Sequence, residues 1–172
     1  MESQKRSGCD IDERKIQILL EITLSVSQWH KRSFNLNGMT FTCAEQAMMY
    51  GKAMLFGDHG IAQRILQRAE PREQKQLGRL VKNFDKAIWE QYCMQIVKEA
   101  NRAKFTQHED LLEALLKTAG TTIVEASPTD SIWGIGLAED DPRASNRWQW
   151  KGTNWLGQVL TELREKLMNQ AE

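Results

Sequence analysis

Glu45 and Lys52 are two ionisable residues whose spacing first suggests chemistry. They stand seven residues apart in a helix-favouring run, so they return to nearly the same helix face, about 10 Å apart along the axis. This separation is too long for a good direct salt bridge, but a small polar group of a substrate fits between the two side chains. The pair therefore predicts a site in which a carboxylate and an ammonium group face one ligand.

The same stretch also has a purely structural interpretation. Thr42 and Glu45 follow the S/T-x-x-E pattern of a helix capping box, in which the glutamate accepts a hydrogen bond from the backbone amide of the threonine. Lys52 is then a solvated residue, and Met49, on the same stripe, belongs to the core. Because a carboxylate has about four acceptor sites, Glu45 can cap the helix and still face a substrate.

A second cluster lies in the segment VEASPTDSIWGIG, residues 124–136. Asp130 ends a Ser-Pro-Thr-Asp turn and is by default a turn former, while Trp133 is by default a core residue. The glycines that follow allow a backbone or a ligand to approach closely. Six tryptophans in the chain favour binding of a flat ring such as a base, and those in loop-like contexts are Trp29, Trp148 and Trp150.

These residues must be positioned by a mainly helical chain with a small sheet. Asn37-Gly38 between two alternating triplets predicts a hairpin over residues 34–41, because a type I′ turn needs positive φ at both central positions. Residues 121–126 predict a buried strand, and residues 22–26 a short one. Helices are predicted over about residues 12–20, 43–55 and 108–119. Further helices are predicted to begin after the N-caps Asp58, Asp85 and Asn154 and at Pro71.

Composition and charge limit the class of protein. The 172 residues suffice for one domain, and 41% hydrophobic with 27% charged residues is typical of a soluble globular protein. The net charge is zero, so no global field attracts the chain to nucleic acid or to an anionic membrane. No apolar run is long enough to span a membrane.

Cysteine and histidine usage indicates a cytoplasmic protein without a metal site. The three cysteines are scattered and odd in number, and the charged start MESQKRSG lacks the features of a signal peptide. We therefore expect free thiols in a reducing compartment. The three histidines show no metal-ligand spacing.

Six separate blocks stand out along the chain: SQWH at 27–30, CAEQAMMYGKA at 43–53, LGR at 77–79, NRAKF at 101–105, VEASPTDSIWGIG at 124–136 and WKGTNWLG at 150–157. In this order they resemble the successive signatures of the YbiA-like, or NADAR, family. The resemblance runs from about Ser27 to Arg164, nearly the whole chain. Where many relatives have Ser-Asn-Phe, this chain has Ser27-Gln28-Trp29, which we interpret as a conservative change in an aromatic wall.

The resemblance implies an α+β fold, a single compact mainly helical domain with a small β-sheet, over residues 21–172. Residues 1–20 then form a polar N-terminal extension with a short helix. Members of the family cleave an N-glycosidic bond in early riboflavin-pathway intermediates, and others remove ADP-ribose from modified guanine in nucleic acid. No metal and no organic cofactor is implied.

Carried over by position, the family's acid falls on Glu45, its lysine on Lys52 and its turn aspartate on Asp130. These three are the expected catalytic residues. The family's ring-stacking tryptophan falls on Trp133 and its cap asparagine on Asn154, and Trp29 of the first block supplies an aromatic wall. The residues expected to bind the substrate are Ser27, Trp29, Trp133 and Asn154.

The chemistry of N-glycosidic cleavage suits these residue types. Breaking the C–N bond builds positive charge on the sugar, which a carboxylate stabilises or uses to activate water, while an acid protonates the leaving nitrogen. Glu45 and Asp130 are the candidates for these roles. Lys52 binds a phosphate or a ribose hydroxyl or, if burial lowers its pKa, attacks the ring-opened sugar aldehyde as an amine.

Three functions stay open at this level. The first is an N-glycosidase acting on a small pyrimidine riboside phosphate. The second is an ADP-ribosyl-guanine hydrolase on nucleic acid, which needs a basic patch beside the pocket, for which the candidates are Lys104, Arg143 and Arg147. The third is a non-catalytic module that senses NAD or ADP-ribose, against which the intact acids and lysine argue. Nucleic acid is thus expected only as a modified substrate, and the oligomeric state is left open.

Overall fold

The computed structural model describes residues 26–170, and these residues form the expected mainly helical α+β fold. The predicted helix over 12–20 lies outside them, as does the predicted strand over 22–26 apart from Val26. The α-helices are α2 (Ala44–Leu55), α3 (His59–Leu66), α4 (Pro71–Gly78), α5 (Lys86–Thr106), α6 (Glu109–Leu116) and α7 (Trp155–Asn169). The strands are β1 (Phe34–Leu36) and β2 (Met39–Phe41), and the 3-10 helices are η1 (Pro142–Ser145) and η2 (Arg147–Gln149).

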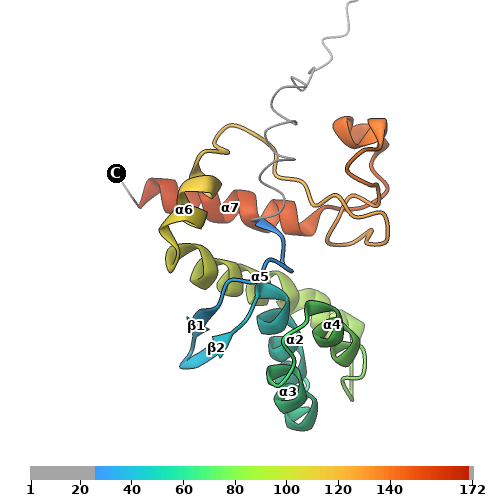
Figure 1. Cartoon of the computed structure of the whole chain (residues 1–172). Coiled ribbons are helices and arrows are strands. Elements are labelled where there is room, and N and C mark those ends of the chain that lie inside the picture. Colours follow the sequence, from blue (N-terminus) through green and yellow to red (C-terminus); the bar gives the residue numbers. More distant parts are fainter. Residues whose placement is uncertain (1–25, 171–172) are drawn as a thin grey trace, which may run out of the picture.

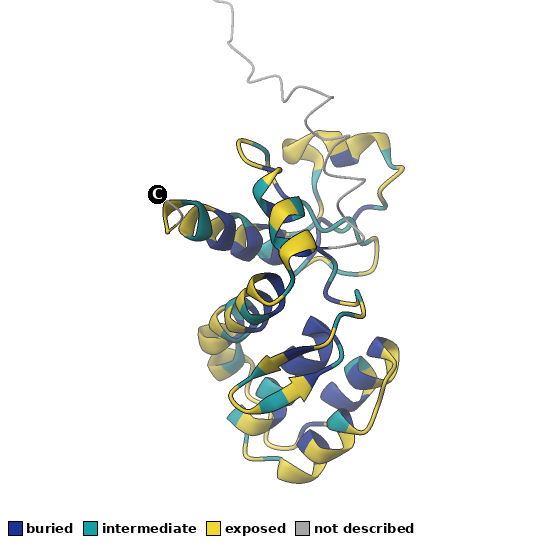
Figure 2. Ribbon diagram, turned by 60° about the vertical axis from the view of Figure 1, so that its left-hand side comes forward, coloured by how far each residue is buried: buried dark blue, intermediate teal, exposed yellow. Residues whose placement is uncertain are grey.

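Helix α5 runs through the middle of the structure and separates two groups of elements (Figure 1). Helices α2, α3 and α4 pack together on one side with the β-hairpin, whereas α6 and α7 pack on the other. Helix α2 contacts α3, α4 and α5, so it is buried along most of its length (Figure 2). Glu45, in the first turn of α2, is therefore buried although its side chain is ionisable.

The predicted hairpin over residues 34–41 is confirmed. Strands β1 and β2 pair antiparallel with Phe34 opposite Phe41. Asn37 has φ 52° and Gly38 has φ 79°, the positive values that a type I′ turn requires. The two phenylalanines are buried against Ala47 of α2, so the hairpin is fixed to the helix that it leads into.

Three predicted helix starts are also confirmed. Asp58 accepts a hydrogen bond from the Ile61 amide at 3.1 Å, and Asp85 accepts one from the Ile88 amide at 3.0 Å. Both are N-caps, of α3 and of α5. Pro71 is the first residue of α4, where its missing amide hydrogen costs nothing.

The predicted capping box at the start of α2 is wrong in its glutamate. The N-cap is Cys43, without a side-chain capping bond. The backbone amide of Thr42 instead donates to Gln46 Oε1 at 2.7 Å, so the residue after Glu45 takes the bond. The Gln46 side chain also donates to the carbonyl oxygens of Ile65 and Arg68, both at 3.0 Å. The carboxylate of Glu45 is therefore not used to start the helix.

The predicted strand over residues 121–126 is also wrong, because these residues pair with no strand in the described part of the chain. The side-chain amide of Asn154 takes the place of a neighbouring strand. Its Oδ1 accepts from the Glu125 amide at 3.0 Å, and its Nδ2 donates to the Ile123 carbonyl at 2.9 Å. Asn154 stands at the N-cap position of α7 with φ 53°, but its side chain does not cap that helix.

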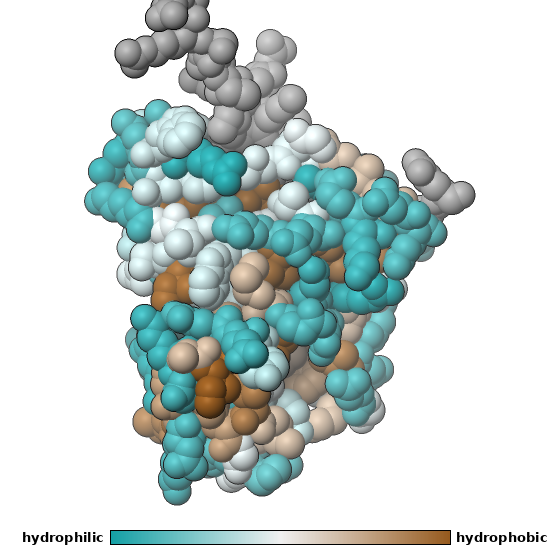
Figure 3. Space-filling view, turned by 180° about the vertical axis from the view of Figure 1, so that it is seen from behind, coloured by the Kyte–Doolittle hydropathy of each residue, from teal (hydrophilic) through white to brown (hydrophobic). Residues whose placement is uncertain are grey.

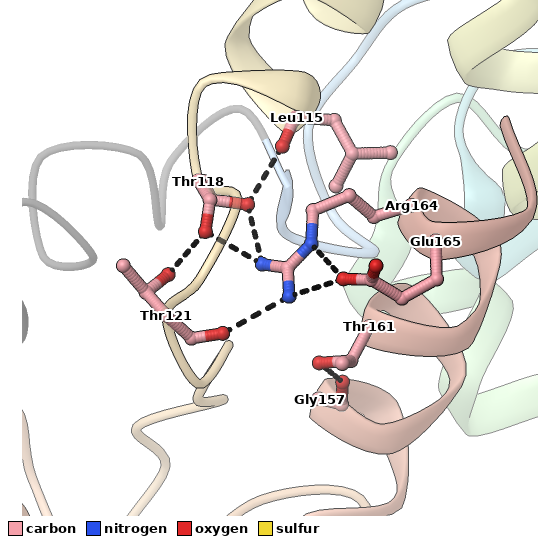
Figure 4. A network of polar contacts seen from close by, with 7 residues as sticks. All are labelled: Leu115, Thr118, Thr121, Gly157, Thr161, Arg164 and Glu165. Atoms are coloured by element: carbon pink, nitrogen blue, oxygen red, sulfur yellow. Dashed lines mark hydrogen bonds and ion pairs between the residues drawn. The ribbon is translucent and has the colours of Figure 1, made fainter. Parts of the chain in front are cut away.

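Arg164 of α7 fixes the turn that leads into this segment (Figure 4). Arg164 is 2% exposed, and its guanidinium donates to the Thr118 carbonyl at 2.7 Å and to the Thr121 carbonyl at 3.1 Å. Glu165 balances the charge at 2.9 Å. Arg164 and Asn154 together attach residues 118–125 to α7.

The surface is largely hydrophilic, with apolar areas between the charged side chains in the view from behind (Figure 3). Several large apolar side chains at the start of α5 and just before it are partly exposed, namely Leu80, Phe84, Ile88 and Tyr92. Among the helices of residues 26–170, none has the length and apolar character needed to cross a membrane.

Candidate active site

A cleft of about 670 Å³ lies between α2, α4 and the loop of residues 125–130. Its size is in the range of small-molecule sites. Helices α2 and α4 approach each other closely at Gly78, where a Cβ atom would collide with the Met49 side chain. Six of the seven residues predicted for the site line this cleft: Ser27, Trp29, Glu45, Lys52, Asp130 and Trp133.

Glu45 is the most buried acid of the cleft, with 5% of its surface exposed. Its backbone amide donates to the Gln28 carbonyl at 2.9 Å, which ties the start of α2 to the segment before the hairpin. Burial raises the pKa of its carboxyl from 4.5 to about 7, against the charge of Lys75 and hydrogen bonding from Trp29, which lower it. Glu45 is thus able to hold or release a proton near neutral pH.

Glu125 is a second acid of the cleft, outside the set of residues predicted from the sequence. Burial first, and then the charge of Asp130, raises its pKa from 4.5 to about 7. Its Oε2 atom is buried without a hydrogen-bond partner. Its backbone amide donates to Asn154 Oδ1 at 3.0 Å. The available signal was an acid directly after the apolar pair Ile123-Val124, where a buried segment reaches a turn.

Asp130 is both the predicted turn former and a cleft residue. Its Oδ1 atom accepts from the amides of Ile132 and Trp133, at 3.0 and 2.8 Å. Its Oδ2 atom lies 3.8 Å from Lys75 Nζ. A Cβ atom at Gly134 would be only 2.9 Å from the backbone oxygens of Asp130 and Glu125, so the absence of a side chain there brings the two acids into one cleft.

Lys52 is partly exposed and lies beside two aromatic rings. Its Nζ atom is 4.4 Å from the ring centre of Phe84 and 5.7 Å from that of Trp89. Burial and the charge of Arg79 lower the pKa of the amine, while Glu45 acts in the opposite direction. The amine is therefore easier to deprotonate than an ordinary lysine.

Lys75 is a further cleft residue outside the set predicted from the sequence. It forms the ion pair with Asp130 and lowers the pKa of both Glu45 and Glu125. It projects from α4, whereas Lys52 projects from α2. The cleft thus holds three carboxyl groups around Lys75, and Lys52 lies farther along α2 beside Arg79.

The aromatic walls come from Trp29 and Trp133. Trp133 packs edge-on against Trp155, with ring centres 5.7 Å apart and an interplanar angle of 85°. Trp29 is 44% exposed, and its backbone amide donates to Ser27 Oγ at 3.2 Å. Of the other loop tryptophans, Trp148 is 95% exposed and Trp150 donates its indole N–H to the Ala144 carbonyl. Neither lines the cleft.

Two predictions do not match the geometry. Asn154 does not line the cleft, because its amide is buried against the backbone of residues 123 and 125. The predicted basic patch beside the cleft is not formed, because Arg143 and Arg147 do not line the cleft. Lys104 is fully buried and donates to the Ser27 carbonyl at 2.9 Å. Arg143 is paired with Asp141 at 2.7 Å. Within the described residues, no group of three or more His, Cys, Asp or Glu residues is placed to hold a metal ion.

The sequence pattern of the NADAR domain matches residues 20–168, so the chain belongs to the NADAR domain family. The solved NMR structure of the Escherichia coli protein YbiA has the same fold, with a TM-score of 0.70 and 29% sequence identity. The match covers 86% of this chain and 79% of that structure. The family resemblance predicted from the sequence blocks is thereby confirmed.

Relatives from other organisms are more similar in sequence. Protein irg-1 of Caenorhabditis elegans is 43% identical over 136 residues, which is 78% of this chain and 64% of that protein, so this chain spans under two thirds of its length. An N-glycosidase of Acanthamoeba polyphaga mimivirus is 45% identical over 145 residues, 81% of this chain and 85% of the viral protein. Several relatives are named N-glycosidases, and these names support a hydrolase acting on N-glycosyl bonds.

Proposed function

We propose that this protein hydrolyses the C–N bond between a base-type ring and a ribose phosphate, in intermediates of the riboflavin pathway. The observation that carries the proposal is the pair of buried acids, Glu45 and Glu125, each with a pKa of about 7, beside Asp130 in one cleft. N-glycoside hydrolysis needs an acid for the leaving nitrogen and a base for water at similar pH. The cleft also offers tryptophan rings on which a base can stack.

In this mechanism one buried carboxyl group donates its proton to the leaving nitrogen as the C–N bond breaks. The positive charge that develops on the ribose is stabilised by a neighbouring carboxylate. Water then adds its oxygen to the anomeric carbon and gives one proton to that carboxylate, which restores the starting proton count. Glu45 is the proposed acid, because it is the more buried of the two glutamates and stays protonated more readily in an apolar setting.

Lys52 has two possible roles in this site. As a charged clamp it binds a phosphate or hydroxyl of the sugar. As a neutral amine it adds to C1 of the ring-opened sugar and expels the nitrogen of the base, which leaves an imine between Lys52 and the sugar. Water then adds to C1, and the free aldehyde sugar and the lysine amine are released. The lowered pKa of its amine is compatible with the second role, since a deprotonated amine is the nucleophile.

Two other functions serve as alternative outcomes. An ADP-ribosyl-guanine hydrolase acting on nucleic acid needs a cationic surface, and the buried position of Lys104 removes one of its candidates. A non-catalytic module for NAD or ADP-ribose needs no pair of acids that titrate near neutrality. Both would use the same cleft.

A substrate panel distinguishes these functions. The protein is incubated with pyrimidine riboside phosphates, ADP-ribosylated guanosine and NAD, and released base is measured by mass spectrometry, with Glu45→Gln as the inactive control. We expect release from the riboside phosphates. Release only from ADP-ribosylated guanosine, or binding of NAD without release of any base, would replace the proposal with the corresponding alternative.

A further inference from the structure

Helix α4 presents a row of three cations to the cleft: Arg72, Lys75 and Arg79. The spacings of three and four residues place these side chains on one helix face, with Arg79 at the C-cap. Lys75 is paired with Asp130. By contrast, neither arginine has a carboxylate within 4.0 Å among residues 26–170.

Arg79 lies close enough to Lys52 to act on its charge. The guanidinium lowers the pKa of the Lys52 amine, and Lys52 itself faces aromatic rings instead of a carboxylate. Two like charges at the wall of a cleft repel each other unless an anion lies between them. Glu45 acts on Lys52 only from a distance, and among residues 26–170 no carboxylate lies within 4.0 Å of Lys52 or Arg79. The position between the two cations is therefore open to an anionic part of a ligand.

The spacing along the helix matches the length of a ribose phosphate. Lys75, beside the acids, and Arg79 are four residues apart, about 6 Å along the helix axis. This is close to the span of a ribose from its anomeric carbon to a phosphate on its 5′ oxygen. A sugar with its anomeric carbon at Glu45 and Asp130 therefore extends its phosphate toward Arg79.

We propose that Arg79 binds the phosphate on the ribose of the substrate and so sets a preference for phosphorylated over unphosphorylated ribosides. The inference deepens the proposed function and rests on it for the identity of the sugar. A guanidinium suits this role, since its planar fork donates two parallel hydrogen bonds to phosphate oxygens. Arg79 is thus a specificity residue, whereas bond cleavage belongs to the acids.

Binding of the reaction's sugar product tests this without any turnover. The dissociation constants of ribose 5-phosphate and of ribose are measured by calorimetry for the wild type, Arg79→Gln and Arg64→Gln. Arg64 is the matched control, an exposed arginine of α3 outside the cleft. We expect the wild type to prefer ribose 5-phosphate by about tenfold or more, Arg79→Gln to lose most of that preference, and Arg64→Gln to keep it.

Arg72→Gln and a cleavage assay separate the possible failures. An unchanged preference in Arg79→Gln, or a preference lost only in Arg72→Gln, overturns the assignment of the phosphate to Arg79. Failure of the wild type to prefer the phosphorylated sugar overturns it as well. If neither the wild type nor any variant releases base, but Arg79→Gln loses the preference for ribose 5-phosphate, the phosphate site stands and the proposed hydrolysis fails.

Discussion

The side chain of Asn154 holds the backbone of Glu125 in place of a neighbouring strand. Its Oδ1 atom accepts the Glu125 amide at 3.0 Å, and its Nδ2 atom donates to the Ile123 carbonyl at 2.9 Å. One side chain at the start of α7 therefore fixes an acid of the cleft that lies 29 positions earlier. Asn154 acts through Glu125 and does not reach the cleft, which makes it a positioning residue.

Asn154→Gly tests this role without straining the backbone, because glycine accepts the positive φ of 53° at this position. The variant leaves a buried amide and a buried carbonyl without partners. We expect a loss of about 2 kcal/mol in unfolding free energy and at least a tenfold fall in base release. Urea unfolding and a kcat measurement check the two effects, and the pH profile of kcat should shift because Glu125 is displaced. An unchanged kcat and pH profile in a destabilised protein would reduce Asn154 to a purely structural role.

Gln46 and Glu45 are neighbours in α2, but substitutions of the two are predicted to differ in their effect on stability. Gln46→Ala removes the acceptor of the Thr42 amide and the donor to two buried carbonyls. We expect it to cost about 2–4 kcal/mol in unfolding free energy. Glu45→Gln keeps the shape and removes only a titrating group, so we expect little loss at pH 7. Urea unfolding of both variants measures the difference, and a large loss in Glu45→Gln would restore a structural role for the glutamate.

The raised pKa values of Glu45 and Glu125 predict how stability depends on pH. Both carboxyls titrate near 7 in the folded protein and near 4.5 when unfolded, so between these values the folded state binds more protons. The contribution is fully present below pH 4.5 and is lost as the pH rises through 7. Between pH 5 and 8 we expect a loss on the order of 1–3 kcal/mol, which Glu45→Gln reduces. Urea unfolding at both pH values measures this loss. An equal loss of unfolding free energy in the wild type and in Glu45→Gln would contradict the raised pKa of Glu45.

Lys52→Arg separates the two roles of the lysine. A charged clamp needs only a cation, so Lys52→Arg then keeps measurable activity, whereas a nucleophile needs a neutral amine that a guanidinium cannot provide. The lowered pKa of Lys52 leads us to expect participation as an amine. Borohydride added during turnover should then fix the sugar to Lys52, as detected by mass spectrometry. No adduct, together with an active Lys52→Arg protein, leaves only the clamp.

Local signals in the sequence predicted the elements that depend on neighbouring residues. Asn37-Gly38 fixes its hairpin through the φ values of two adjacent residues, and Asp58 and Asp85 cap their helices across three positions. The wrong predictions concern bonds with distant partners. Residues 121–126 have the composition of a strand, but most of their backbone bonds go to distant groups, namely the side chains of Asn154 and Arg164 and the amide of Ile135, which no local pattern indicates.

The candidate site was predictable to the extent that its residues occur in recognisable blocks. Glu45, Lys52 and Asp130 line one cleft although they come from two separate blocks. The capping pattern assigned the bond from the Thr42 amide to Glu45, whereas Gln46 accepts it, so the Glu45 carboxylate is not used in capping. Glu125 and Lys75 were missed because their importance arises from burial and from charges across the cleft, which only the packing of α4 against α2 brings together.

The most direct test of the proposed hydrolysis is the rate of base release from a pyrimidine riboside 5′-phosphate under single-turnover conditions, for the wild type and for Glu45→Gln. We expect the wild type to release the base and Glu45→Gln to be at least about 100-fold slower, in line with general acid catalysis, while its urea midpoint shows that it is folded. Release at the wild-type rate by Glu45→Gln would remove Glu45 from the chemistry. No release by the wild type would contradict hydrolysis of this substrate class.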